Sequence, residues 1–292
     1  MPAYFKTGSM NKYFLLFGLI ALAACNNSSS TDNNNTATPD TTAKVSTGVP
    51  VPQSLTANPV SMYPHDITSF TEGLQVYNGK LYEGAGDFAN SSLRIEDITT
   101  GKVLQKHMMG SAEIFGEGIN VFKGKIYQLT WQNHIVYVYN ENDITKPITT
   151  FTWPYEGWGM TNDGTNLIIS DGGKNGYLYY VNPDDFKIIK TITVQDNNGP
   201  MDQMNELEYI DGFIYANIWN TDNIIKINPA NGYVVATINC AGLLQKADPT
   251  DFNDPGFDHE ANVLNGIAYD NATKKIYITG KRWPKLFEVT FN

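Results

Sequence analysis

Residues 73–84 read GLQVYNGKLYEG, so two short runs of alternating apolar and polar side chains flank the pair Asn78-Gly79. Alternation with a period of two is typical of a β-strand with one buried face. Asn-Gly between two such runs is a strong local signal for a tight turn between antiparallel strands. We therefore predict a β-hairpin at this point of the chain.

The same hairpin pattern returns along most of the chain. Its turn glycines are Gly79, Gly124, Gly164 and Gly212, which lie 45, 40 and 48 residues apart, and a related turn occupies residues 272–275. A third β-type run follows each hairpin, and most units add a fourth after a Gly or Pro turn. The third runs are Leu93 to Ile95, Ile135 to Tyr139, Tyr177 to Val181, Asn223 to Ile227 and Leu286 to Phe291.

Units of about four strands that repeat every 40 to 50 residues or so are typical of a β-propeller. We therefore predict an all-β fold, a five-bladed β-propeller over residues 59–292. A β-sandwich is the alternative, although sandwich strands do not normally repeat so regularly.

The fifth unit ends at Asn292, after its third strand. A blade without its outer strand would expose an unpaired edge. The segment Pro59 to Pro64 is a short β-capable run that precedes the first hairpin. We predict that it pairs with the strand at Leu286 to Phe291 and so closes the last blade.

The beginning of the chain follows different rules. Lys6 and Lys12 precede an apolar run over residues 13–24, which ends in Cys25. This is the pattern of a bacterial lipoprotein signal peptide, so we predict a signal peptide over residues 1–25 and lipidation at Cys25. The alternative is an ordinary signal peptide with a chance cysteine. Residues 26–58 are rich in Ser, Thr, Asn and Asp, which predicts a disordered tether.

These features predict a lipid-anchored protein of the bacterial cell envelope, in the periplasm or outer membrane, that meets the membrane only through its anchor. The formal charge of −10 comes from 20 Lys and Arg against 30 Asp and Glu. An acidic chain repels phosphate backbones, so no nucleic-acid partner is expected. We expect a monomer.

Other candidate chemistry is sparse. Cys240 is the only cysteine besides Cys25, so the folded part contains no disulfide, and we predict that Cys240 is a small buried side chain. The histidines are scattered along the chain and are interpreted as surface or turn residues rather than as a zinc ligand set. They are His65, His107, His134 and His259.

Aligning the units on their turns places chemically informative residues at equivalent positions. One set opens the first strands, and the other follows the second strands. Because the first strand begins where the antiparallel second strand ends, we expect both sets at one mouth of the central channel. The two sets are Glu72, Glu117, Trp158, Asn205 and Asn265, and Trp131, Trp219 and Lys281.

A wet channel would by itself explain Glu and Asn on the innermost strands. It explains three tryptophans poorly, because aromatic walls with a few polar groups are typical of a small-ligand pocket. We therefore interpret this mouth as a binding or catalytic site.

Six motifs in this region, taken in order, make the chain resemble a known family. It is similar, from about His65 to Phe291, to the plant and bacterial type of glutaminyl-peptide cyclotransferase, a five-bladed propeller enzyme. The motifs are His65-Asp66 with Phe70-Thr71-Glu72-Gly73-Leu74, Phe115-Gly116-Glu117-Gly118-Ile119, Gln128-Leu129-Thr130-Trp131, Gly157-Trp158-Gly159-Met160, Asn205-Glu206-Leu207-Glu208-Tyr209, and Asn265-Gly266-Ile267-Ala268 with Thr279-Gly280-Lys281.

The resemblance implies that Glu117 is the catalytic acid and base and that the three indoles line the pocket. Asn205 and Lys281 would contact the substrate, and we place Glu72 and Asn265 in the same binding site. Such an enzyme acts on peptides or proteins with an N-terminal Gln and requires no cofactor for catalysis. The sequence leaves open whether the channel holds a structural Ca²⁺. The chain departs from the resemblance at Glu72, where the family commonly has Gln.

The chemistry of that reaction suits these groups. An N-terminal Gln cyclises when its α-amine attacks its own side-chain amide carbon and expels ammonia. The amine must lose a proton and the leaving nitrogen must gain one, which a single carboxyl group can do. The developing oxyanion needs donors, and an indole N–H, the Asn205 amide or Lys281 could supply them.

Two other classes of function remain open from sequence. Glu72, Glu117, Asn205 and Asn265 carry oxygen atoms that could bind Ca²⁺ in a metal-dependent propeller lactonase or hydrolase. The chain could also be a non-catalytic, peptide-binding surface propeller. Sensitivity to a chelator would indicate the first, and indifference to Glu117→Gln would indicate the second.

Overall fold

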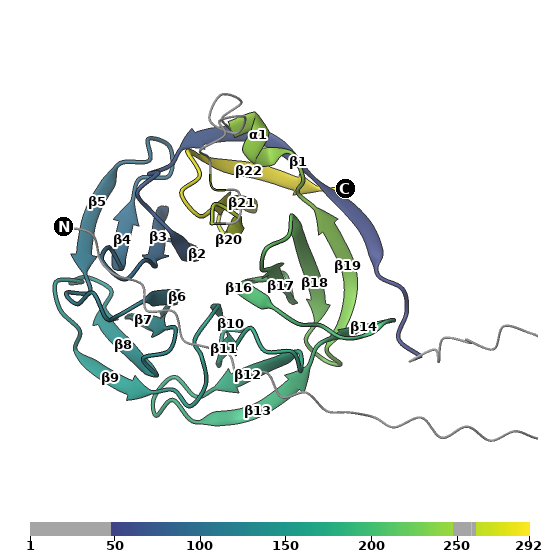
Figure 1. Cartoon of the computed structure of the whole chain (residues 1–292), viewed down its shortest axis with the longest axis horizontal. Coiled ribbons are helices and arrows are strands. Elements are labelled where there is room, and N and C mark those ends of the chain that lie inside the picture. The colour runs from purple at the N-terminus through teal and green to yellow at the C-terminus, as the bar shows by residue number, and fades with distance from the viewer. Residues whose placement is uncertain (1–47, 248–257, 259–260) are drawn as a thin grey trace, which may run out of the picture. The chain divides into compact units, whose positions relative to one another are not determined.

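The structure is a computed structural model that describes residues 48–247, 258 and 261–292 (Figure 1). The chain divides into two units, residues 1–44 and 45–292, and all described residues belong to the second. The predicted signal peptide, the lipidation site Cys25 and most of the predicted tether lie outside the described residues. In the described part of the chain, no helix has the length and apolar character needed to cross a membrane.

Strands are the dominant secondary structure of the described unit, and only one short α-helix occurs among the described residues, which confirms the predicted all-β class. Three of its sheets each contain four consecutive antiparallel strands. The first sheet contains β2 (Thr71–Tyr77), β3 (Lys80–Ala85), β4 (Ser92–Glu96) and β5 (Val103–Met108). The second sheet contains β6 (Gly116–Phe122), β7 (Lys125–Thr130), β8 (Ile135–Asn140) and β9 (Thr149–Thr152). The third sheet contains β10 (Met160–Asn162), β11 (Leu167–Ser170), β12 (Tyr177–Val181) and β13 (Ile188–Thr193).

The remaining strands join into one larger sheet with the order β16-β17-β18-β19-β1-β22-β21-β20. A short hairpin and a short helix accompany it. These elements are β1 (Gln53–Pro64), β14 (Gln195–Asp196), β15 (Gly199–Pro200), β16 (Met204–Ile210), β17 (Phe213–Ile218), β18 (Asn223–Asn228), β19 (Tyr233–Asn239), α1 (Leu243–Ala247), β20 (Leu264–Asp270), β21 (Lys275–Gly280) and β22 (Lys285–Phe291).

The hairpin prediction at residues 73–84 is confirmed, because β2 and β3 pair with Tyr77 opposite Lys80. The two turn residues, Asn78 and Gly79, have φ angles of 49° and 71°. Positive φ at both positions is the requirement of a type I′ turn, whose twist matches that of the two strands. Asn and Gly tolerate this conformation best, which explains why the sequence signal was reliable.

The strand β1 joins the two halves of the large sheet, because it lies between β19 and β22. Residues Pro59 to Pro64 pair antiparallel with β22, as predicted, from Pro59 opposite Val289 to Pro64 opposite Lys285. The predicted boundary of the tether at residue 58 is wrong, because β1 begins at Gln53. Residues Gln53 to Thr56 pair in parallel with β19. Backbone pairing needs few apolar side chains, so the polar composition of this segment concealed the strand.

The sheets are arranged around a common centre, with β2, β6, β10, β16 and β20 innermost (Figure 1). Each of these strands contacts the next, and β20 contacts β2. Glu206 on β16 fixes this arrangement from the middle, since its carboxylate accepts hydrogen bonds from Leu74 N at 3.2 Å and Ile267 N at 2.7 Å. The first residues of the innermost strands are thereby held close together.

Apolar side chains fill the spaces between neighbouring sheets. Trp153, which follows β9, packs edge-on against Tyr179 of β12, with ring centroids 5.5 Å apart. Trp283, in the connection between β21 and β22, packs against Phe287 in the same way. Burial of such large rings is the dominant stabilising contribution in a β-fold of this kind. Cys240 is buried here without a disulfide, as predicted.

Removing residues 1–64 should lower the melting temperature by roughly 10 °C. The truncation removes the partner of both β19 and β22, and a loss of about 3 kcal/mol shifts the transition of a domain of this size by roughly 6 to 12 °C. Calorimetry provides the measurement. Removing only residues 1–47 is the control, because it leaves β1 intact. The same transition in both shortened chains would contradict the role assigned to β1.

Candidate functional site

A cavity of about 490 Å³ lies where the innermost strands begin. Seven of the eight residues predicted from the repeat line it, so the alignment of the units placed them correctly. The lining residues are Phe70, Glu72, Phe115, Glu117, Trp131, Trp158, Asn205, Trp219, Ala261 and Lys281. Asn265, the eighth predicted residue, is fully buried and reaches the cavity only through its contact with Glu72.

Regular β-structure positions most of these groups. Glu72, Glu117 and Asn205 occupy the second position of β2, β6 and β16. Trp131, Trp219 and Lys281 each follow the last residue of a second strand, β7, β17 and β21. Side chains that begin and end paired antiparallel strands meet at one edge of the sheet, which explains their convergence.

Trp158 precedes β10 and lies against the backbone of Gly172. Gly172 has a φ of +61°, and a Cβ atom there would lie 2.3 Å from the indole. A glycine is therefore required at this position, both for the backbone conformation and for the space that the ring occupies. Trp158 also packs edge-on against Trp219, with ring centroids 5.8 Å apart.

Glu72 carries the central polar contact of the cavity. Its Oε1 lies 2.7 Å from the Lys281 ammonium, and both side chains are almost completely buried. Its Oε2 accepts a hydrogen bond of 3.1 Å from Asn265 Nδ2. Burial raises the pKa of Glu72, while the adjacent ammonium opposes that rise. Asn265, predicted to bind substrate, instead holds this carboxylate in place.

Glu117 is the buried carboxyl group next to this ion pair. Burial raises its pKa well above the usual range, and the negative charge of Glu72 raises it further. Glu117 and Glu72 are hydrogen-bonded to each other, and one carboxyl of such a pair must hold a proton. Because Lys281 and Asn265 favour the charged form of Glu72, the proton lies on Glu117.

Glu156 is a functional residue that the sequence analysis missed. Its Oε2 accepts hydrogen bonds from Trp131 Nε1 at 2.8 Å and from Trp158 Nε1 at 3.1 Å. These two indoles therefore point their N–H groups at Glu156, which argues against them as oxyanion donors. Glu156 lies in the loop between β9 and β10, outside the repeat, and only its position two residues before Trp158 could have indicated it.

Phe70 and Phe115 form an aromatic wall that was also missed. Their ring centroids lie 6.1 Å apart, and the Phe115 ring lies 5.8 Å from Trp131. The Lys281 ammonium lies 4.6 Å from the centre of the Phe70 ring, a cation–π distance. The repeat contained the signal, since each Phe stands directly before an innermost strand, two residues before a predicted carboxylate.

Asn205 has an amide with unused hydrogen-bonding capacity. Its Oδ1 is buried and has no hydrogen-bond partner in the part of the chain that the structure describes. The residue lines the cavity and is held by its backbone carbonyl, which accepts from Ser170 Oγ at 2.8 Å. A buried polar atom without a partner is costly, so this amide is prepared to pair with a bound molecule.

A sequence model of the family described as glutamine cyclotransferase matches residues 24–291 of this chain. The chain belongs to this family. A glutaminyl-peptide cyclotransferase of Arabidopsis thaliana is 33% identical over 235 residues, which cover 79% of this chain and 69% of the plant protein. The crystal structure of Myxococcus xanthus glutaminyl cyclase is similar with a TM-score of 0.73 at 31% identity, covering 82% of this chain and 98% of that one. The resemblance inferred from the six motifs is thereby confirmed.

Glu156→Ala should raise KM for a glutaminyl-peptide substrate about 10-fold. Two indoles lose their charged acceptor, and a hydrogen bond to a charged group contributes about 1.5 to 3 kcal/mol. Steady-state kinetics and tryptophan fluorescence report the change. Glu113→Ala is the matched control, because Glu113 is exposed. An unchanged KM in Glu156→Ala would show that the indoles do not depend on this carboxylate.

Proposed function

We propose that this enzyme converts the N-terminal Gln of peptides and proteins into pyroglutamate with release of ammonia, and that Glu117 is its general acid and base. The observation that supports this most is a buried carboxyl group of raised pKa, in an aromatic cavity, in a chain of the glutamine cyclotransferase family. The reaction uses no redox centre and no protein nucleophile.

The reaction is intramolecular, so the cavity mainly has to hold the substrate in a folded conformation. The α-amine nitrogen forms a bond to the side-chain amide carbon, and the bond from that carbon to the amide nitrogen breaks. Holding both groups in contact is worth several kcal/mol of the barrier. We assign this task to the aromatic surfaces of Trp131, Trp158 and Trp219, two of which Glu156 orients.

Proton transfer is the second task, and we assign it to Glu117. A free α-amine has a pKa of about 7.7 to 8.0, so much of the substrate arrives as ammonium. Glu117 first has to lose its own proton, and its carboxylate then takes the proton that the attacking nitrogen must lose and passes it to the leaving amide nitrogen, which departs as ammonia. A carboxyl whose pKa is raised above its ordinary value suits both steps.

The oxyanion that develops on the amide oxygen needs a donor. The indole N–H groups of Trp131 and Trp158 are bound to Glu156, and the Lys281 ammonium is bound to Glu72. Asn205 is the best remaining candidate, because it lines the cavity and its side-chain NH₂ group donates no hydrogen bond among the described residues. We propose that Asn205 stabilises the oxyanion and that Lys281 acts mainly by holding Glu72.

The metal-dependent lactonase is not favoured. The Lys281 ammonium lies 2.7 Å from Glu72 Oε1, which is one of the oxygen atoms that would have to bind Ca²⁺. This ammonium supplies the positive charge that a cation would bring. The family match likewise gives no support to a lactonase or to a non-catalytic scaffold.

We also propose that the described unit is a five-bladed β-propeller. Two blades would share the large sheet, one from β16 to β19 and the other from β20 to β22 with β1. The double pairing of β1, parallel with β19 and antiparallel with β22, supports this division.

We further propose that the enzyme is a monomer at the bacterial cell envelope, anchored by a lipid at Cys25. The support is the apolar run that closes on Cys25 and the polar segment that follows it. Its partners would be proteins and peptides with an N-terminal Gln rather than nucleic acids, which the acidic charge of the chain disfavours.

Glu117→Gln should lower turnover by about 10² to 10⁴ with little change in substrate affinity, because the amide can neither accept nor return a proton. Ammonia release from a Gln-initiated peptide measures this. Glu72→Gln is the matched control and should retain turnover. It removes the charge that raises the pKa of Glu117, so the acidic limb of its pH–rate profile should move to lower pH.

The reverse result, in which Glu72→Gln abolishes turnover and Glu117→Gln does not, would transfer the catalytic role to Glu72. Release of ammonia at the wild-type rate by both variants would contradict the proposed function of the site as a whole.

A further inference from the structure

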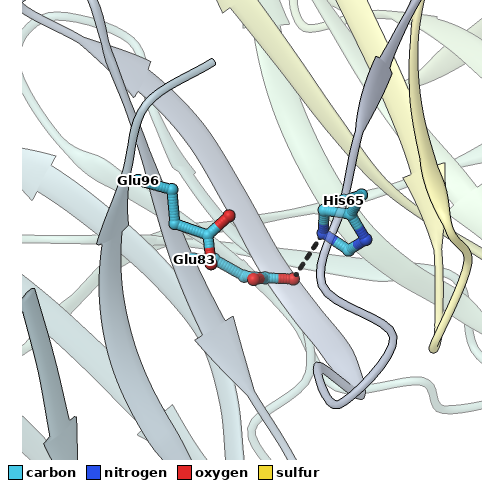
Figure 2. Close-up of side chains that lie close together, drawn as sticks. All are labelled: His65, Glu83 and Glu96. Atoms are coloured by element: carbon cyan, nitrogen blue, oxygen red, sulfur yellow. Dashed lines mark hydrogen bonds and ion pairs between the residues drawn. The ribbon is translucent and has the colours of Figure 1, made fainter. Parts of the chain in front are cut away.

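A second group of titratable side chains lies outside the cavity, at the side of the first sheet (Figure 2). It consists of His65, which follows β1, Glu83 on β3 and Glu96 on β4, and all three are buried. One nitrogen or oxygen atom from each lies within 4.8 Å of the other two. The interpretation of His65 as a surface or turn residue is therefore wrong, because the fold brings it to two carboxylates that are distant in sequence.

The imidazole of His65 is held in a defined orientation. Its Nδ1 lies 2.8 Å from the carbonyl oxygen of Trp283, to which it donates. Its Nε2 then faces Glu83 Oε1 at 3.2 Å (Figure 2). Metal-binding histidines typically donate one ring N–H to a carbonyl or carboxylate in this way, which directs the lone pair of the other nitrogen at the metal.

The two carboxylates have unused oxygen atoms. Glu83 Oε1 accepts a hydrogen bond of 2.7 Å from Thr71 Oγ1. Glu83 Oε2 and both oxygens of Glu96 are buried without a hydrogen-bond donor among the described residues, and in Figure 2 the Glu96 side chain points at Glu83. Two ionised carboxylates without donors are too costly to bury, so positive charge must lie between them.

The neighbouring guanidinium supplies only part of this charge. Arg94 favours the ionised forms of Glu83 and Glu96 but donates a hydrogen bond to neither, and its Nη1 lies 2.8 Å from Asp66 Oδ2. Further positive charge is therefore needed between Glu83 and Glu96. Two protons, one on His65 and one on Glu96, meet this requirement, and so does a single divalent cation.

Protons on His65 and Glu96 are the alternative to a metal ion in this cluster. Burial and the nearby charge of Glu83 raise the pKa of Glu96 to about 8. Burial opposes the charge on His65, but the Glu83 carboxylate outweighs it and raises the pKa of His65 to about 9. A metal must therefore displace two protons, which divalent zinc does readily at histidine and carboxylate ligands.

We propose that His65, Glu83 and Glu96 form a binding site for a zinc ion. Imidazole nitrogen with carboxylate oxygen is a donor set that zinc prefers, whereas Mg²⁺ and Ca²⁺ prefer oxygen alone. Two ligands at about 2.1 Å from a tetrahedral zinc lie roughly 3.4 Å apart, which is close to the 3.2 Å between His65 Nε2 and Glu83 Oε1. The second oxygen of either carboxylate is available as a fourth ligand.

Zinc at this position would fasten the connection between β1 and β2 to the strands β3 and β4. This connection leads directly to Thr71, which donates to Glu83, and to the catalytic-site residue Glu72. The ion lies outside the cavity and takes no part in the reaction, so the site has a structural role and is independent of the proposed function.

The site is tested by calorimetry at pH 8, in which zinc alone is titrated into the full chain after treatment with a chelator. We expect one zinc per chain and a rise in melting temperature on binding. Glu96→Gln should weaken the affinity by more than about 100-fold, because even the loss of a group that merely orients a metal ligand costs roughly 10- to 100-fold. His65→Asn should weaken it similarly.

Glu96→Gln is the decisive variant, because Gln resembles the neutral form of Glu96 and should leave the zinc-free melting temperature near the wild-type value. His134→Asn is the matched control, since His134 is exposed and its φ of 58° suits Asn. It should bind zinc as the wild type does. If the wild type takes up no stoichiometric zinc, two protons occupy the cluster and the proposal is overturned. Equal zinc affinity in Glu96→Gln and the wild type would also overturn it, since the ion would then bind elsewhere.

Discussion

The protonation of Glu117 depends on one buried ion pair, in which the Lys281 ammonium lies 2.7 Å from Glu72 Oε1. This pair keeps a charged carboxylate beside Glu117 in a cavity that is otherwise largely aromatic. A buried ion pair is weak evidence for stability, because desolvation offsets most of the attraction. Its effect here is electrostatic, because the Glu72 charge makes ionisation of Glu117 unfavourable and raises the pKa of that carboxyl further.

The ion pair in turn depends on closure of the fold. Glu72 comes from β2 and Lys281 from the end of β21, more than 200 residues later in the chain. They meet because β2 and β20 lie side by side among the innermost strands, tied from the centre by Glu206. The strand β1 completes the sheet that holds β20 and β21. A strand from the beginning of the folded unit thus sustains a contact in the candidate site.

Sequence reasoning succeeded where a residue stands in the repeat. Glu117, Trp131 and Lys281 were placed correctly because each occupies a fixed position relative to a hairpin turn. It failed where the structure uses contacts that no local pattern records. Glu156 lies in a loop outside the repeat, Gln53 to Thr56 pair through their backbone, and His65 meets its carboxylates only after folding. The alignment of the units identified Asn265, but only the structure shows that its side chain donates a hydrogen bond to Glu72.

The central claim is that Glu117 holds a proton because burial and the Glu72 charge oppose its ionisation. Carbon NMR titration of the full chain, with ¹³C-labelled glutamate carboxyl groups and Glu117→Gln to assign the resonance, measures this directly. The account predicts that Glu117 titrates well above its ordinary pKa of 4.5 and that Glu72→Gln lowers this value. A Glu117 carboxyl that titrates near 4.5 in the wild type, or whose pKa is unaffected by Glu72→Gln, would contradict the account.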